Sequence, residues 1–426
     1  MKRILGLTVG LMIVAAPVFA QDVPFHGFVQ TNYSARVAHV GDVPEGMAAK
    51  EKDLILGDTR AQLELAGFSH TGNAAFSAKL DFYRDAIDGG SELDLREAYL
   101  DLSLWKFDFR VGRQIITWGL GDLVFINDVF PKDWVAFLSG RPLEYLKVGS
   151  DALSLSFHPG FLSAQGVILP FFEPDAFPTG ERLFYFNPIL PYAKRMETHK
   201  PELQFKHFEA AGRIYRTLGR LDLSLYGYRG FHRRPGMRFD PQSGDLILFY
   251  PELGVYGASA QGTLLSGVFS LEGGYSDSVE DRDGIDPSIE NPQIKLLAGY
   301  SRMFGADLTV GVQYLGEVML KYDAYEASLG PMQALLPHFP KQEQVRHNLT
   351  FRAVRFLKYQ TLRFSLFTWA SPNDEDYYLN PEVRYSFTDE LWVALGGNIF
   401  GGTEDHTFFG QFDPNDNVYV TLRYGF

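Results

Sequence analysis

The stretch from which the fold can be worked out is the last ten residues, Asn417-Val418-Tyr419-Val420-Thr421-Leu422-Arg423-Tyr424-Gly425-Phe426. Apolar side chains alternate here with polar or small ones. Successive side chains of a β-strand point to opposite faces, so the stretch predicts a strand with one wholly apolar face. The edge strand of a soluble sheet could show the same pattern. The rest of the chain must therefore decide which kind of sheet this strand belongs to.

The amino terminus has the pattern of a secretory signal peptide. A basic start, Met1-Lys2-Arg3, precedes an apolar run over residues 4–16 and small residues suited to cleavage after Ala20. The apolar run is too short for a membrane helix. We therefore predict a signal peptide over residues 1–20 and an exported protein over residues 21–426. The chain contains no cysteine, so we expect neither disulfides nor thiolate metal sites.

The remaining composition favours a single barrel domain over residues 21–426. No later segment reaches the roughly 18 consecutive apolar residues that a membrane helix needs. A Pro/Gly/Ser linker is also missing, although 426 residues would ordinarily form two or three soluble domains. The chain has 42 glycines, 15% aromatic residues and many short alternating runs. This combination is typical of an antiparallel barrel that crosses lipid by pairing every backbone group between strands.

Eighteen runs have the pattern of strands, and the connections between them fall into two classes. The runs lie near residues 25–39, 54–69, 74–87, 93–105, 107–119, 150–158, 161–172, 202–217, 220–232, 247–264, 267–278, 293–303, 307–320, 346–357, 361–371, 376–387, 391–401 and 416–426. Every second connection is short, and most of the others are long or polar. This alternation predicts short periplasmic turns and long outer loops, with an even strand count. Sixteen strands is the alternative, because the runs at 150–158 and 247–264 are weak. The last strand should pair with the first.

Two features resemble known outer-membrane proteins. A final strand that ends on an aromatic residue resembles the C-terminal strand of bacterial outer-membrane barrels. Gly112-Arg113-Gln114, Trp118-Gly119 and Asn127-Asp128 with Pro131-Lys132-Asp133 resemble a poorly characterised, porin-like family of such barrels. The resemblance implies the outer membrane of a Gram-negative bacterium, with outer-membrane lipid as a partner. The acidic outer loops are also expected to bridge to lipopolysaccharide through divalent cations. Since porins are often trimers, the resemblance also allows a homo-oligomer.

Porins have a long loop that folds back into the lumen, and this resemblance implies a role for residues 120–149. Asp122, Asp128, Lys132 and Asp133 would then narrow the pore as a constriction loop. The alternative is an outer loop packed over the rim of the barrel. The sequence leaves both open.

The polar strand faces predict the walls of a water-filled lumen, since a charge on the lipid face costs about 2–4 kcal/mol at mid-membrane. The predicted basic pore-lining residues are Arg60, Arg352, Arg363, Arg384 and Arg423. The predicted acidic ones are Asp81, Glu97, Asp101 and Asp108. Two such walls would orient and steer charged solutes. Alternatively, these charges only pair with one another. Aromatic residues beside the short turns, such as Trp105 and Trp392, are expected in an interfacial girdle.

Metal and enzyme signals are weak. Asp281, Asp283 and Glu290 match three positions of a calcium loop, but Val279 stands at the first position and strands flank the segment. A solvated acidic turn is the alternative. The chain has no zinc-protease, nucleophile-elbow, phosphate-loop or haem-attachment motif. We therefore expect no enzyme and no cofactor.

The sequence thus predicts a passive, porin-like channel for small polar or anionic solutes. Only residues 21–24 precede the first strand of the mature chain, so we expect no plug domain. An acidic chain without a basic tract is also a poor nucleic-acid binder. Two alternatives remain open: a barrel sheath that encloses a periplasmic electron-transfer partner, and an outer-membrane hydrolase.

Overall fold

The computed structural model describes residues 25–37, 47–48, 53–87, 89–189, 193–335 and 339–426. The predicted signal peptide, residues 1–20, lies outside the described residues.

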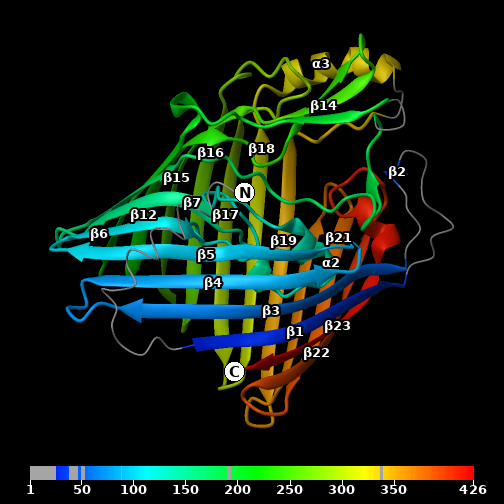
Figure 1. Cartoon of the computed structure of the whole chain (residues 1–426). Coiled ribbons are helices and arrows are strands. Elements are labelled where there is room, and N and C mark those ends of the chain that lie inside the picture. The colour runs from blue at the N-terminus through cyan, green and yellow to red at the C-terminus, as the bar shows by residue number, and fades with distance from the viewer. Residues whose placement is uncertain (1–24, 38–46, 49–52, 88, 190–192, 336–338) are drawn as a thin grey trace.

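Eighteen antiparallel strands form one closed barrel (Figure 1). They are β1 (Phe25–Arg36), β3 (Leu54–Phe68), β4 (Ala74–Asp85), β5 (Ser91–Leu104), β6 (Phe107–Gln114), β7 (Ser150–Phe157), β8 (Ser163–Leu169), β11 (Glu209–Leu218), β12 (Leu221–Phe231), β15 (Glu252–Leu264), β16 (Gly267–Ser278), β17 (Gln293–Phe304), β18 (Leu308–Met319), β19 (Val345–Leu357), β20 (Leu362–Ser371), β21 (Asp376–Ser386), β22 (Leu391–Gly402) and β23 (Asn417–Gly425). The predicted fold class and the strand count of eighteen are confirmed, and the count of sixteen is wrong.

The last strand closes the barrel against the first, as predicted. β23 pairs antiparallel with β1 over nine residues, with Gln30 opposite Arg423 and Tyr33 opposite Val420. The aromatic ring of Phe426 stacks on that of Phe25, with 5.8 Å between centroids. Every inward or outward position of β23 is therefore fixed by its pairing with both β1 and β22.

Short and long connections lie at opposite ends of the barrel, which we call the turn end and the loop end. The turn end carries short links such as Leu265-Ser266, which joins β15 to β16 with positive φ at both residues. The connections of the loop end contain the other small elements: β2 (Met47–Ala48), β9 (Tyr185–Phe186), β10 (Met196–His199), β13 (Gly236–Asp240), β14 (Asp245–Phe249), α2 (Trp134–Ser139), α3 (Tyr322–Leu335), η3 (Leu143–Tyr145), η5 (Phe205–His207) and η6 (Gly410–Asn415). Figure 1 shows α3 and β14 together at this end and α2 inside the ring of strands.

Three predicted strand boundaries are wrong. The run at 247–264 is two strands, β14 and β15, because Pro251 between them has no N–H to donate to a ladder. Residues 202–208 precede β11 and contain η5 instead of a strand. β6 ends at Gln114, five residues early, because the chain leaves the wall there and enters the lumen.

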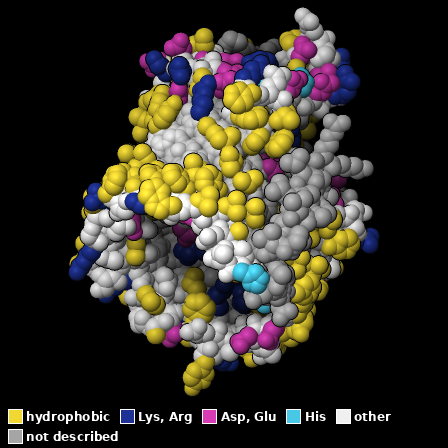
Figure 2. All heavy atoms as spheres, turned by 60° about the vertical axis from the view of Figure 1, so that its left-hand side comes forward, with side chains coloured by type: hydrophobic (Ala, Val, Ile, Leu, Met, Phe, Trp, Pro, Cys, Tyr) yellow, Lys and Arg dark blue, Asp and Glu magenta, His cyan; other side chains and the backbone are white. Residues whose placement is uncertain are grey.

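The outward faces are apolar, and Figure 2 shows a broad belt of hydrophobic side chains with a hollow below it that contains basic and acidic side chains. Trp105 is exposed on the turn end, as expected of a girdle residue. Trp392, in contrast, is only 8% exposed and points into the lumen, where it contacts Arg384. Its position in β22 puts it on the inward face. None of the helices in the described ranges is long and apolar enough to cross a membrane.

Candidate pore constriction

Residues 115–149, which join β6 to β7, fold into the lumen and form what we call the inward segment. Its apolar side chains pack against inward-facing strand residues in three places. Trp118 packs against Tyr226, Ile126 lies in a cluster with Leu297, and Phe137 contacts Tyr378. The alternative of a loop packed over the rim is therefore wrong, because these strand residues line the inside of the wall.

One side of the inward segment is held by hydrogen bonds from the wall of β16 and β18. The buried Glu272 carboxylate accepts the backbone N–H groups of Leu120 (2.5 Å) and Asn127 (3.0 Å) and the side-chain amide of Asn127 (2.9 Å). Gln313 accepts the N–H of Asp122 at 2.8 Å and donates to its carbonyl at 2.9 Å. Two strand side chains thus fix a turn of irregular backbone whose polar groups would otherwise lack partners.

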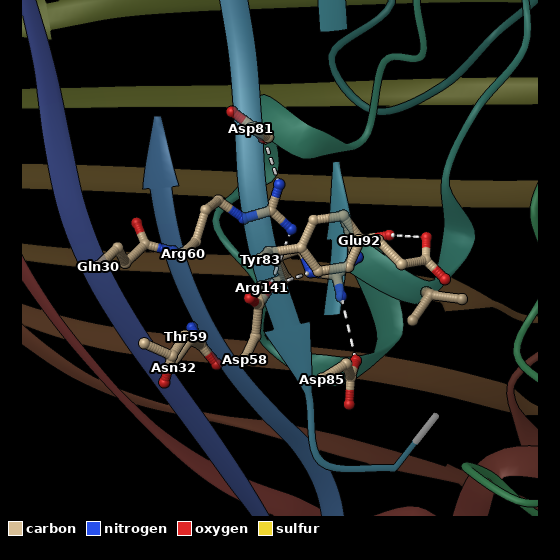
Figure 3. A network of polar contacts seen from close by, with 12 residues as sticks. Gln30, Asn32, Asp58, Thr59, Arg60, Asp81, Tyr83, Asp85, Glu92 and Arg141 are labelled. Atoms are coloured by element: carbon tan, nitrogen blue, oxygen red, sulfur yellow. Dashed lines mark hydrogen bonds and ion pairs between the residues drawn. The ribbon is translucent and has the colours of Figure 1, made fainter. Parts of the chain in front are cut away.

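The other side is held by a buried charge network on β3 and β4 (Figure 3). Arg141 of the inward segment lies 3.1 Å from Asp58 and 3.5 Å from Asp85. Arg60 lies 3.0 Å from the same Asp58 and also bonds Asp81. Because these groups are at most 9% exposed, removing one member would leave a buried charge unpaired, which is strongly destabilising.

A third attachment ties the inward segment to the loop end. Arg233 donates to both oxygens of the fully buried Glu209, at 3.1 and 2.7 Å, and also to the carbonyls of Val129 and Glu173. Within the inward segment, the buried Lys132 ammonium lies 3.0 Å from Asp128. Burial lowers the pKa of Lys132, and the nearby Asp128 and Asp175 carboxylates oppose that shift.

The turn-end side of the inward segment borders a cavity of about 330 Å³, which we call the arginine cavity. Four of the five predicted basic residues line it: Arg352, Arg363, Arg384 and Arg423, joined by Arg141, Glu144 and Glu382. Five arginines therefore face two glutamates. The fifth predicted residue, Arg60, does not reach the cavity, because it is 4% exposed within the charge network of β3 and β4.

The arginines of the cavity differ in how their charge is satisfied. Arg352 lies 2.5 Å from Asp122, Arg363 pairs with Glu382, and Arg423 pairs with Glu144. Arg384 has no carboxylate within 4 Å among the described residues. Its guanidinium instead stacks over the Trp392 ring, 3.9 Å from the centroid. Its N–H groups have no hydrogen-bond acceptor among the described residues. Arg384 is thus the residue in this cavity best placed to bind an anion.

Three of the four predicted acidic pore-lining residues, Asp81, Glu97 and Asp101, are paired with basic side chains. Asp81 is 1% exposed and bonded to Arg60 and Gln62. Glu97 lies 3.1 Å from Lys79, and the Asp101 carboxylate accepts two hydrogen bonds from Arg110. Asp108 accepts from Ser103 at 2.6 Å and lies 3.4 Å from His158. The alternative interpretation, that the lumen charges pair with one another, therefore fits Asp81, Glu97 and Asp101.

The four predicted constriction residues separate into different roles. Only Asp122 contacts the four strand arginines of the cavity, which we call the arginine row (Arg352, Arg363, Arg384 and Arg423), and it does so through Arg352. Asp128 and Lys132 pair with each other and border a second cavity. Asp133 lies 3.1 Å from Arg141 and caps α2 by accepting the N–H of Ala136. Three of the predicted four, Asp128, Lys132 and Asp133, are therefore internal ties of the inward segment.

The second cavity, of about 310 Å³, lies on the loop-end side of the inward segment and has mixed charge. On its rim, Glu317 lies 3.0 Å from Lys295 and 3.6 Å from Arg346. Arg234 stands among the rings of Trp134, Phe177 and Phe408, about 5 Å from each centroid. Burial lowers the pKa of His232, whose ring lies 3.9 Å from Glu290.

The candidate calcium ligands Asp281, Asp283 and Glu290 are not arranged as a calcium site. Both oxygens of Asp281 accept backbone N–H groups, from Ile285 at 3.1 Å and Asp286 at 2.8 Å. Glu290 faces His232 instead of Asp281 and Asp283. Within the described ranges, no group of three acidic or histidine side chains is arranged to hold a metal ion. Residues 279–292 therefore fit the alternative, an acidic turn.

Sequence reasoning missed the residues that position the inward segment. Glu272, the only acid on the inward face of β16, was a usable signal, because a carboxylate among glycines and serines needs partners. Arg141 and Glu144 carried no comparable signal, since their partners come from other parts of the chain.

The chain is a closed barrel of eighteen strands with an inward segment and a charged lumen. Crystal structures of Pseudomonas aeruginosa proteins share this fold. OccK2 (OpdF), in complex with glucuronate, aligns with a TM-score of 0.59 at 12% identity, over 96% of this chain and 98% of that one. OccK5 (OpdH) aligns with a TM-score of 0.54 at 11% identity, over 96% and 98%. OccD3 (OpdP) has a TM-score of 0.54 at 10% identity, over 96% and 92%. No protein-family model and no curated protein sequence matches the chain.

Proposed function

We propose that the chain is a passive outer-membrane channel for small polar or anionic solutes, with the inward segment as its constriction. The observation that carries the proposal is Arg384, an arginine without a carboxylate partner among the described residues, in a cavity of five arginines and two glutamates. The crystal structure of OccK2 with glucuronate, a carboxylate, supports the same class of solute.

The balance of charge in the lumen supports an anion preference over a merely structural arginine row. Asp81, Asp85, Glu97 and Asp101 of β4 and β5 each lie within 4 Å of a basic side chain, so these four leave little free negative field. Arg384 also has Arg363 and Arg423 as neighbours in the same cavity, and a row of like charges attracts a solute of opposite charge. A carboxylate that crosses the constriction would find N–H donors at Arg384 that are free to bind it. The other three wall arginines already form ion pairs with acidic side chains of the chain.

The barrel would lie in the bacterial outer membrane after removal of its signal peptide. The turn end would face the periplasm and the loop end the exterior, with lipopolysaccharide around the loop end. Residues 1–20 would be removed by signal peptidase, so the intact mass of the purified barrel should correspond to a chain that begins at Gln21.

The sheath alternative receives no support from the lumen. Residues 115–149 of the chain itself occupy the interior, and the two cavities beside them measure about 330 and 310 Å³. Such spaces hold small solutes and are far smaller than a folded electron-transfer protein. No observation specifically favours the hydrolase alternative.

Ion selectivity in planar bilayers tests the channel. Under a KCl gradient we expect the wild type to prefer chloride. Arg384→Gln should lower the anion-to-cation permeability ratio by roughly fivefold, because a unit charge at 4 Å is worth about 1 kcal/mol in water. Added glucuronate should reduce the wild-type current at lower concentration than it reduces that of the variant.

Arg355→Gln is the matched control, since Arg355 is exposed on the outward face of β19 and should leave selectivity unchanged. Unchanged selectivity in Arg384→Gln would show that the arginine row is structural. A wild type that does not conduct would refute the channel itself.

A further inference from the structure

Three glycines lie side by side on the outer wall. Gly166 of β8 is directly opposite Gly212 of β11, which is directly opposite Gly227 of β12. Their neighbours on the same outward face are large and exposed, such as Ile214 at 51% and Leu225 at 61%. The row therefore forms a notch in an otherwise apolar surface.

Neither of the usual reasons for glycine applies to this row. None of the three has a positive φ, so the backbone would accept any residue. A Cβ placed on any of them would meet no atom within 4 Å, so no packing inside the chain excludes a side chain. They are the only glycines of the described strands that combine both properties. Glycine inside a strand weakens it and often marks close approach of a ligand or another backbone. The row therefore indicates an occupant from outside the chain.

The notch belongs to a larger depression. It forms a hollow of about 430 Å³ that is also bordered by Ile214 and Leu225. The same two residues border an adjoining hollow of about 890 Å³, which continues across the outward faces of β15 to β17. Its floor is made of small side chains: Ala258, Ala260, Gly273 and Ala298. The two hollows together form an apolar trench along the wall.

The trench has a positive charge at one end. Arg216 borders the larger hollow, four residues along β11 from Gly212 toward the turn end, or about 13 Å at 3.3 Å per residue. Its side chain is exposed and forms no ion pair with any residue in the described ranges. Arg220, in the turn that follows β11, is likewise exposed and unpaired in the described part of the chain. The trench thus combines an apolar floor with guanidinium groups at the turn end.

We propose that this trench binds one anionic glycerophospholipid, with its phosphate at Arg216 and one acyl chain over Gly212 and Gly227. The proposal rests on the outer-membrane orientation proposed above, in which the turn end faces the periplasmic leaflet, where phospholipids lie. A guanidinium matches a phosphate in geometry and charge, and an acyl chain matches a narrow trench of small residues. A second copy of the chain is the competing occupant.

Native mass spectrometry of the purified, delipidated barrel, titrated with phosphatidylglycerol, tests the proposal. We expect one tightly bound phosphatidylglycerol per wild-type barrel. Arg216→Gln should weaken this binding about tenfold, the worth of a hydrogen bond to a charged group. Gly212→Leu with Gly227→Leu, which fills the notch, should weaken it similarly. Arg355→Gln, an exposed arginine outside the trench, should bind like the wild type.

Binding in Arg216→Gln equal to that of the wild type would overturn the proposal. So would a wild-type dimer that the two Gly→Leu changes dissociate without changing the lipid count, because the trench would then be an interface between copies. Bilayer conductance of each variant shows whether the barrel is intact. An anion-selective channel that binds no phosphatidylglycerol overturns this inference alone, whereas a lipid-binding barrel that does not conduct overturns the proposed function.

Discussion

At the scale of single residues, Asp416 carries a pH dependence. It lies between η6 and β23 at the loop end, and its carboxylate accepts the N–H of Phe400 at 2.7 Å. Burial raises its pKa to about 6, the hydrogen bond from Phe400 opposes the shift, and the nearby Asp413 adds to it. Folding therefore favours the protonated form. The stability that protonation contributes is complete below the unfolded pKa, about 3.9 for Asp, and is lost as pH rises through about 6.

We therefore expect Asp416→Asn to gain stability relative to the wild type as pH rises from 4 to 7. The amide cannot ionise, so it avoids the cost of a partly buried charge. The midpoint of thermal unfolding, followed by tryptophan fluorescence at several pH values, measures the difference. Asp389→Asn, in an exposed link at the turn end, serves as the control and should follow the wild type. A difference between Asp416→Asn and the wild type that does not vary with pH would contradict the assignment.

The sequence was sufficient to predict which strand residues face the lumen, because inward and outward side chains alternate along a strand. Arg352, Arg363, Arg384 and Arg423 were predicted to share the lumen, and all four line one cavity. Arg60 has the same parity, but the sequence could not show that Asp58 and Asp81 would bury it. The unpaired state of Arg384 was also beyond prediction. It depends on Glu144 and Asp122, which the inward segment brings to other arginines from more than 200 residues away.

At the scale of elements, the inward segment is irregular backbone held by strand side chains. Strand positions were predictable because a two-residue period and short turns are local signals. The path of residues 115–149 was not, because its partners Glu272 and Gln313 lie 145 to 191 residues further along the chain. Even the end of β6 was missed, since the strand stops where these distant contacts begin.

Glu272→Ala should loosen the constriction without opening the barrel. The change leaves three N–H donors of Leu120 and Asn127 without their acceptor, and each such donor costs about 1–3 kcal/mol when buried. We expect larger single-channel conductance and more current noise in the open state.

Gln261→Ala is the matched control for this change. Gln261 is a partly buried inward residue of the neighbouring strand β15, and its amide bonds Ser270 instead of the inward segment. If both variants conduct like the wild type, Glu272 does not hold the constriction.

At the scale of the whole molecule, closure depends on the pairing of β23 with β1. Tyr33 and Val420 are directly opposed on the outward face of this seam. Because the chain has no cysteine of its own, Tyr33→Cys with Val420→Cys should form a single, unambiguous cross-link on oxidation.

The cross-linked chain should migrate differently on a denaturing gel until it is reduced. Tyr33→Cys with Tyr424→Cys, four residues further along β23, is the control, since these positions are too far apart to be bridged. Equal cross-linking of both pairs would mean that the register of the seam is not fixed.

The inward segment shares its contacts with walls on opposite sides of the barrel, through Arg141 to β3 and β4 and through Glu272 to β16. The inward segment is therefore a brace across the cylinder. A change that removes the contacts on one side, such as Glu272→Ala, should leave the inward segment attached to β3 and β4 through Arg141, so we expect the constriction to loosen while the cylinder stays closed.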